Sequence, residues 1–130
     1  MNLKEQVPLA PLTTFKIGGP ARYFVEAKTV EEVTEALAFA RAHSLPIFIL
    51  GGGSNILVAD DGFAGVVLHL QLANLLFEDR DDAVLVTADA GVVWDELVTQ
   101  AVQHGYAGVE SLSGIPGTVG GAVVANLGAY

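Results

Sequence analysis

The sequence predicts an α+β fold, because its local patterns follow the order strand, helix, four strands, helix. Two amphipathic segments, at about 29–45 and 92–104, carry apolar residues at spacings of three and four. The strand segments are short and rich in apolar, aromatic or β-branched residues. With 130 residues, the chain is one domain or part of one and is long enough to bury a core.

The first strand and helix are defined by local signals. ARYFVEA at 21–27 predicts a strand, and it follows the turn signal GGP at 18–20. Thr29 stands three residues before Glu32, the spacing of a capping box, so a helix is expected to begin there. The helix must end before Pro46. Four residues at helical spacing are expected to form its buried face: Val30, Val33, Leu37 and Ala40.

The later elements alternate with turns. PIFIL is too short and too apolar for anything but a buried strand, whereas EDRDD reads as a polar break. The second helix is expected from about Val92 to His104, with Gly105 as its left-handed stop. The strand segments after the first helix are PIFIL at 46–50, ILVA at 56–59, GVVLHL at 65–70 and AVLVTADA at 83–90.

The charge distribution limits the ligands that this chain is expected to bind. The net charge is −9, and residues 42–79 and 81–130 contain no Lys or Arg. Nucleic acid and anionic membranes are not expected as partners, because both attract clustered basic residues. An anion bound in those regions must be held by backbone amides, hydroxyl groups or helix ends.

Cysteine and histidine usage bounds the metal chemistry and the compartment. Without cysteine, neither disulfides nor thiolate zinc sites can form. His43, His69 and His104 are scattered, so no metal site is expected. No stretch has the length and apolar character of a signal peptide or a membrane span, and a cytoplasmic protein is expected.

Two glycine-rich segments are the candidate binding loops, GGGSN at 51–55 and SGIPGTVGG at 113–121. A dinucleotide fingerprint fails in the first, because Ile56 occupies the third glycine position and no helix pattern follows. A P-loop fails because no lysine follows the glycines. The first loop can form either an anion-binding nest of backbone N–H groups or a tight hairpin turn.

The second loop has two readings as well, a ligand-binding loop or an irregular connection whose glycines only allow close packing. Both loops follow apolar segments and neither contains a basic residue. Considered together, they favour a buried, anionic, nucleotide-like ligand gripped from two sides.

Three stretches resemble the N-terminal part of the MurB family, the UDP-N-acetylenolpyruvoylglucosamine reductases. They are PLTTFKIGGPARYFVEAKTVEEV, ILGGGSNILVADDGFAGVVLHL and SLSGIPGTVGGAVVANLGAY. The resemblance implies the FAD-binding fold of the vanillyl-alcohol oxidase (PCMH) type, with a small β-α-β-β subdomain followed by the start of a second α+β subdomain. It also implies FAD as cofactor, and an NADPH-dependent reduction of a UDP-sugar enolpyruvyl ether to UDP-N-acetylmuramate for peptidoglycan.

The resemblance assigns cofactor-binding roles by position. It implies a pyrophosphate loop of Gly51, Gly52, Gly53, Ser54 and Asn55. It implies a segment along the diphosphate and the flavin made of Ile115, Pro116, Gly117, Thr118, Gly120 and Gly121. It also implies that this half of the site is closed by Asn126, Gly128, Ala129 and Tyr130. One departure is Ala125, where members of the family often carry a longer side chain, Gln or Met.

The resemblance also divides the chain. It implies an N-terminal lead-in at 1–20, a first FAD-binding subdomain at 21–75 and the start of a second at 76–130. The substrate domain, the substrate-anchoring Arg, the Ser proton donor and a late Glu of the family are expected beyond residue 130. No catalytic residue is therefore expected in this chain, which should bind FAD weakly, lack full activity and expose apolar edges that allow self-association.

Two alternatives to this interpretation stay open. One is an FAD-dependent oxidase of the same superfamily acting on an alcohol or a sugar, although such enzymes often tether the flavin through His or Cys near the pyrophosphate loop. The chain has no Cys, and GGGSN has no His. The other is a flavin-free module that binds nucleotides or a partner protein.

Overall fold

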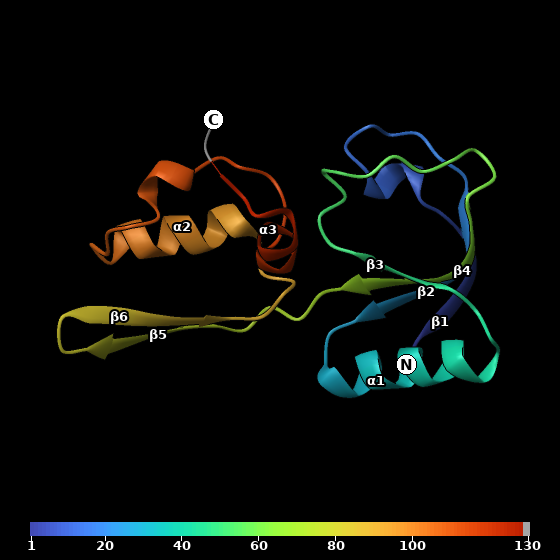
Figure 1. The fold of residues 1–130 in the computed structure, drawn as a ribbon, viewed down its shortest axis with the longest axis horizontal. Helices are drawn as coiled ribbons and strands as arrows, with labels where there is room; N and C mark the ends of the chain where they lie inside the picture. Colours follow the sequence, from blue (N-terminus) through green and yellow to red (C-terminus); the bar gives the residue numbers. More distant parts are fainter. Residues whose placement is uncertain (129–130) are drawn as a thin grey trace.

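The computed structural model describes residues 1–128 and arranges them in two groups of elements (Figure 1). In the first group, four strands pair in the order β1-β2-β4-β3. β1 (Leu3–Pro8) is antiparallel to β2 (Pro20–Ala27), whereas β2 and β3 (Ile47–Leu50) both run parallel to β4 (Phe63–Leu70). α1 (Val30–Ala42) packs on one face of this sheet.

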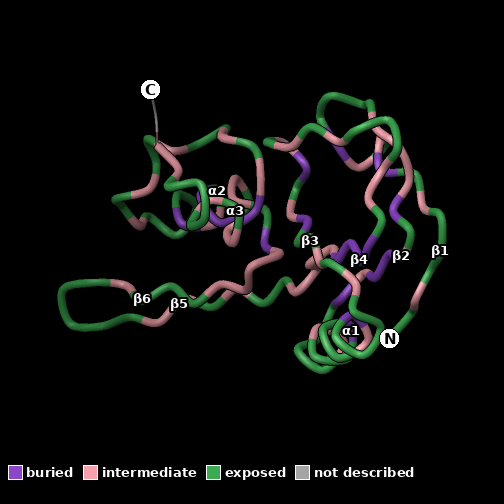
Figure 2. Tube along the Cα trace, turned by 45° about the vertical axis from the view of Figure 1, so that its right-hand side comes forward, coloured by how far each residue is buried: buried purple, intermediate pink, exposed green. Residues whose placement is uncertain are grey.

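The sheet is buried on both faces, as expected where parallel strands lie in its centre. Figure 2 shows the buried residues concentrated along β2, β4 and the sheet-facing side of α1. On β4, Val66 and Leu68 belong to the cluster under α1, whereas Val67 belongs to the cluster on the opposite face. That second cluster also includes Leu9, beside the 3₁₀ turn η1 (Ala10–Leu12).

The second group begins with a hairpin of β5 (Leu75–Arg80) and β6 (Ala83–Ala88). α2 (Trp94–Gln103), the 3₁₀ turn η2 (Glu110–Leu112) and α3 (Val119–Ala125) follow. α2 lies along the hairpin in Figure 1. The contact at the end of α2 is aromatic, since the ring of Phe77 lies 5.7 Å from that of His104 and 5.5 Å from that of Tyr106.

The capping signal at the start of α1 is confirmed. The Thr29 hydroxyl accepts a hydrogen bond from the backbone N–H of Glu32 (3.2 Å). The Glu32 carboxylate accepts one from the backbone N–H of Lys28 (2.7 Å), one residue before the cap. The first bond satisfies a backbone donor that a helix start leaves free, whereas the second goes to the residue before the cap and not to the Thr29 N–H of a standard capping box. His43 and His104 form the C-caps of α1 and α2, and Gly105 has the left-handed conformation expected.

The expected buried face of α1 was only partly right. Ala36 and Ala40 are buried, and Val33 packs beside them. Val30 and Leu37 are instead 64% and 46% exposed. The small alanine side chains let the helix approach the sheet closely, so the helix turns the alanine side rather than the bulkier apolar side inwards.

Three strand or loop predictions were also wrong, and some elements were not predicted at all. β3 lies at a sheet edge, so Phe48 and Ile49 are 37% and 47% exposed rather than buried. ILVA at 56–59 is irregular, because it belongs to the crossover between two parallel strands. The expected polar break is the end of β5, which solvent can reach. β1, β5 and α3 had no counterpart among the expected elements.

The topology also rules out the hairpin interpretation of the first glycine loop. A tight hairpin joins antiparallel strands, but β3 and β4 are parallel. The loop therefore starts a longer connection, and no helix follows it at 56–59. Within residues 1–128, no helix is long and apolar enough to cross a membrane.

Candidate cofactor-binding site

One cavity of about 730 Å³ gathers the expected site residues. It is lined from both groups of elements, by the first glycine loop after β3 and by the second glycine loop with α3. Thirteen of the expected residues line it: Gly51, Gly52, Gly53, Ser54, Asn55, Ile115, Pro116, Gly117, Thr118, Gly120, Gly121, Asn126 and Gly128. Ala129 and Tyr130 lie outside the described residues.

The first two glycines of GGGSN allow the two loops to touch. A Cβ added to Gly51 would lie 2.8 Å from the Thr118 hydroxyl oxygen. A Cβ added to Gly52 would lie 3.1 Å from the Cα of Gly117. Both distances are shorter than ordinary van der Waals contact. Bare backbone at 51 and 52 is therefore required for this packing between loops that are more than 60 residues apart in sequence.

The third glycine serves a different contact. Gly53 has φ +68°, and a Cβ there would collide with the carbonyl oxygen of Leu12. Its own carbonyl accepts a hydrogen bond from the backbone N–H of Thr14 (3.0 Å). Gly53 thus fixes the first loop to the segment after η1, whereas its two neighbours meet the second loop.

The second glycine loop is bonded to the segment that precedes α2. The backbone N–H of Trp94 donates to the carbonyl of Gly117 (2.9 Å), and that of Val119 donates to Val92 (2.8 Å). The N–H of Gly120 donates to the carbonyl of Ala90 (2.9 Å). These bonds form a short ladder, so the position of the loop is set by backbone pairing.

Two side chains of α2 hold the start of the same loop. The Asp95 carboxylate accepts hydrogen bonds from the backbone N–H of Gly114 (2.6 Å) and from the Ser113 hydroxyl (3.3 Å). The indole N–H of Trp94 donates to the carbonyl of Leu112 (3.0 Å). Sequence reasoning missed Asp95, because its partners lie 18 and 19 residues away.

α3 carries small residues along the cavity wall. Its cap is Thr118, which is 7% exposed and accepts a hydrogen bond from the backbone N–H of Gly121 (3.4 Å). Asn126 closes the helix in the left-handed conformation (φ 50°). Two glycines in a seven-residue helix lower its propensity, so the helix gave no pattern from which it could be predicted.

The cavity wall contains no charged side chain within the described chain. Its polar groups are backbone amides and carbonyls together with Ser54, Asn55, Thr118 and Asn126. An anionic ligand would therefore meet neutral donors, which agrees with the absence of Lys and Arg from both loops. No group of three or more potential metal-ligating side chains occurs among residues 1–128.

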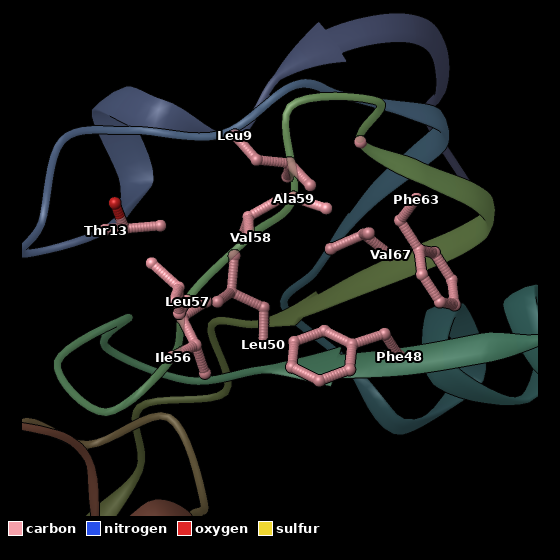
Figure 3. Close-up of a pocket in the computed structure, with 11 residues that line it drawn as sticks. Leu9, Thr13, Phe48, Leu50, Ile56, Leu57, Val58, Ala59, Phe63 and Val67 are labelled. Atoms are coloured by element: carbon pink, nitrogen blue, oxygen red, sulfur yellow. The ribbon is translucent and has the colours of Figure 1, made fainter.

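A smaller apolar pocket of about 280 Å³ lies behind the first loop (Figure 3). It shares Phe48 and Ile56 with the larger cavity. Leu50, Val67 and Leu9 line its inner side, and Thr13 contributes its one hydroxyl. The segment 56–59, which was expected to be a strand, supplies part of this lining.

An extended dinucleotide fits these features. The cavity has the volume of a small-molecule site, and its two loops present backbone without Cβ atoms. The fold and the cavity together fit a nucleotide-binding module of mixed α+β type. The sequence model of the FAD binding domain family matches residues 21–130, and the chain belongs to this family.

Similar proteins indicate the type of enzyme in which this domain occurs. The chain is 46% identical over 127 residues to a UDP-N-acetylenolpyruvoylglucosamine reductase of Cutibacterium acnes, covering 97% of this chain and 34% of the relative. It is 44% identical over 130 residues to the enzyme of the same name from Thermobifida fusca, covering 99% and 36%. The chain thus spans about a third of the length of these relatives.

A solved structure agrees with the fold. The crystal structure of the reductase (MurB) from Thermus caldophilus superposes with a TM-score of 0.77 at 34% sequence identity. The match covers 99% of this chain and 44% of that one. The resemblance to the FAD-binding part of MurB and the FAD-binding fold of the PCMH type are both confirmed.

Proposed function

We propose that this chain supplies the FAD site of an NADPH-dependent reductase that converts UDP-N-acetylglucosamine enolpyruvate to UDP-N-acetylmuramate. The observation that carries the proposal is the packing of two uncharged glycine loops against each other on the wall of one cavity. FAD supplies the hydride chemistry when bound, while the chain binds and orients it. The names of the relatives support the substrate and the NADPH requirement.

The proposed diphosphate position lies between the two loops. Backbone N–H groups of 51–55, with the Ser54 hydroxyl and the Asn55 amide, are the proposed donors on one side. Residues 115–118, with Gly120 and Gly121, are proposed to run along the diphosphate and the flavin from the other side. Closure by Asn126, Gly128 and Tyr130 belongs to the same proposal.

The full reaction is proposed to need residues outside this chain. The relatives are about three times longer than the matched region. Reduction of an enolpyruvyl group requires a proton donor as well as a hydride, and no residue of this chain is proposed for that role. The cytoplasmic location expected from the sequence is part of this proposal.

A titration with flavins tests the cofactor site. The absorbance and fluorescence of FAD should change when it binds, and FAD should raise the melting temperature of the chain. Riboflavin, which lacks both the diphosphate and the adenylate, should bind at least roughly tenfold more weakly. Equal affinity for FAD and riboflavin would contradict a diphosphate site, and no spectral or thermal change with FAD would contradict the site altogether.

A turnover assay tests the proposal that this chain binds FAD but lacks the catalytic residues. Mixed with FAD, NADPH and the enolpyruvyl UDP-sugar, the chain should give no substrate-dependent oxidation of NADPH. Substrate-dependent turnover by the chain alone would show that the catalytic residues lie within 1–130.

Self-association is proposed from the exposed edge of the sheet. β3 is an edge strand that carries two exposed apolar side chains, Phe48 and Ile49. Such edges can pair with another chain. Light scattering should detect dimers or larger species without FAD, and a monodisperse monomer over the same concentrations would refute this part of the proposal.

A further inference from the structure

We propose that His69 is a positioning residue beneath the first glycine loop, and that its protonation is coupled to binding of the FAD diphosphate. The inference rests on the diphosphate position proposed above. It concerns a residue that does not line the cavity and acts through the loop that does.

His69 occupies the end of β4 at the edge where the first loop begins. Its register partners are Glu26 on β2 and Leu50 on β3, and Gly51 follows Leu50 directly. The imidazole shares a sheet face with Phe24, whose ring centroid is 6.0 Å away. His69 therefore pairs with the residue directly before the first loop, at the carboxyl end of two parallel strands.

The ring has unused hydrogen-bonding capacity. Its Nδ1 atom is buried and has no hydrogen-bond partner among the described residues. A buried polar atom without a partner is costly in a folded protein. Packing alone therefore does not explain a histidine at this position.

The charged group that faces His69 is already paired with a base. Glu26 faces it from β2, and the Glu26 carboxylate pairs with Lys4 of β1 at 2.9 Å. Lys28, just after β2, also acts on Glu26. Asp60 and Asp61 precede β4 at its far end, about 20 Å from His69 along the strand. β3 and residues 51–55 contain no ionisable side chain, so His69 is the one titratable base of β3, the first loop and β4.

Opposing effects act on the protonation of the ring. Burial lowers the pKa of His69, whereas the Glu26 carboxylate and the Gly51 carbonyl raise it. Without ligand the neutral form is favoured. A diphosphate on the other side of Gly51 adds negative charge and favours the protonated form, so FAD binding should take up protons.

Calorimetry of FAD binding tests this linkage on the wild-type chain. Titrations at about pH 6.5 in two buffers of different ionisation enthalpy should reveal fractional proton uptake. The Kd for FAD should fall roughly 3- to 10-fold between about pH 8 and pH 6. His69→Gln should abolish both effects. His43→Gln, which changes an exposed histidine at the end of α1, should retain both.

An NMR titration of the His69 ring covers the case in which His69→Gln does not fold. In the wild-type chain, the pKa of His69 should rise when FAD is added. FAD binding without proton uptake, or with an unchanged His69 titration, would overturn this inference and leave the FAD site intact. Absence of FAD binding at every pH would overturn the proposed site and this inference together.

Discussion

Gly52 and Gly117 lie against each other across the two glycine loops, with 3.1 Å between a Cβ added to Gly52 and the Cα of Gly117. Gly52→Ala would push the loops apart by a few tenths of an ångström, because Gly117 cannot yield like a flexible side chain. We expect FAD affinity to fall roughly tenfold with a smaller loss of stability. Flavin titration and thermal melting separate the two effects.

The control for Gly52→Ala is Gly108→Ala. Gly108 lies outside the cavity, and a Cβ there would meet nothing within 4 Å. Its positive φ of 118° predicts a loss of stability without a loss of FAD affinity. Equal FAD affinities of the two variants would contradict the role assigned to the loop contact.

Gly53→Ala should be the most destabilising change in the first loop. Gly53 combines φ +68° with a Cβ position that collides with the Leu12 carbonyl. Gly105 has a similar φ of +75° with nothing within 4 Å. Gly105→Ala should cost about 1 kcal/mol of unfolding free energy, and Gly53→Ala about 3 kcal/mol or more. Urea denaturation of both variants checks the difference, and equal losses would contradict the packing argument.

Thr118→Val should weaken both the fold and FAD binding. The hydroxyl caps α3 and lies beside Gly51 on the cavity wall. Thr29→Val is the matched control, since Thr29 caps α1 away from the cavity. Each variant should lose about 1 kcal/mol of unfolding free energy. Only Thr118→Val should also raise the Kd for FAD, and a similar rise for both would indicate a general effect of lost stability.

Asp95→Ala should loosen the second loop. Asp95 accepts hydrogen bonds from Gly114 and Ser113, whereas Glu96 bonds only Gln100 on the same helix. Both acids stand in the first turn of α2, where a carboxylate interacts favourably with the helix dipole. We expect FAD affinity to fall roughly 3- to 10-fold in Asp95→Ala and to stay unchanged in Glu96→Ala. Unchanged FAD affinity in both variants would contradict a role for Asp95 in positioning the second loop.

The parts of the fold that could be predicted from the sequence have local causes. Thr29 and Glu32 define the start of α1 because a capping bond needs only a few residues. β5 was missed because a two-stranded ribbon leaves polar residues in solvent. α3 was missed because it is held by the Thr118 cap and by backbone bonds to residues 90–92. Neither feature produces the apolar spacing from which a helix is predicted.

The sequence singled out residues that line the cavity, but it did not indicate how the two loops pack against each other. Residues 51–55 and 115–121 could be singled out because they are glycine-rich, follow apolar segments and contain no basic residue. The sequence could not reveal that Gly52 meets Gly117, because that contact depends on how the two groups of elements pack. Asp95 and His69 were missed for the same reason, since their partners are distant in sequence.

Stability without ligand should fall as the solution becomes acidic, and His69 should cause part of this fall. Burial lowers the pKa of His69 below its ordinary value of 6.5, whereas the unfolded chain keeps that value. Below about pH 6.5 the unfolded state therefore binds more protons than the folded state. The unfolding free energy should decrease as the pH drops from there toward the folded-state pKa of His69.

Urea denaturation over this pH range, with wild type and His69→Gln, checks the effect. The variant should lose less stability between about pH 6.5 and pH 5 than the wild type does. Glu26 acts in a separate window, because its hydrogen bond to Lys4 lowers its pKa below 4.5, so its contribution is lost only at more acidic pH. A His69→Gln curve parallel to the wild type would show that the buried ring does not titrate in this range.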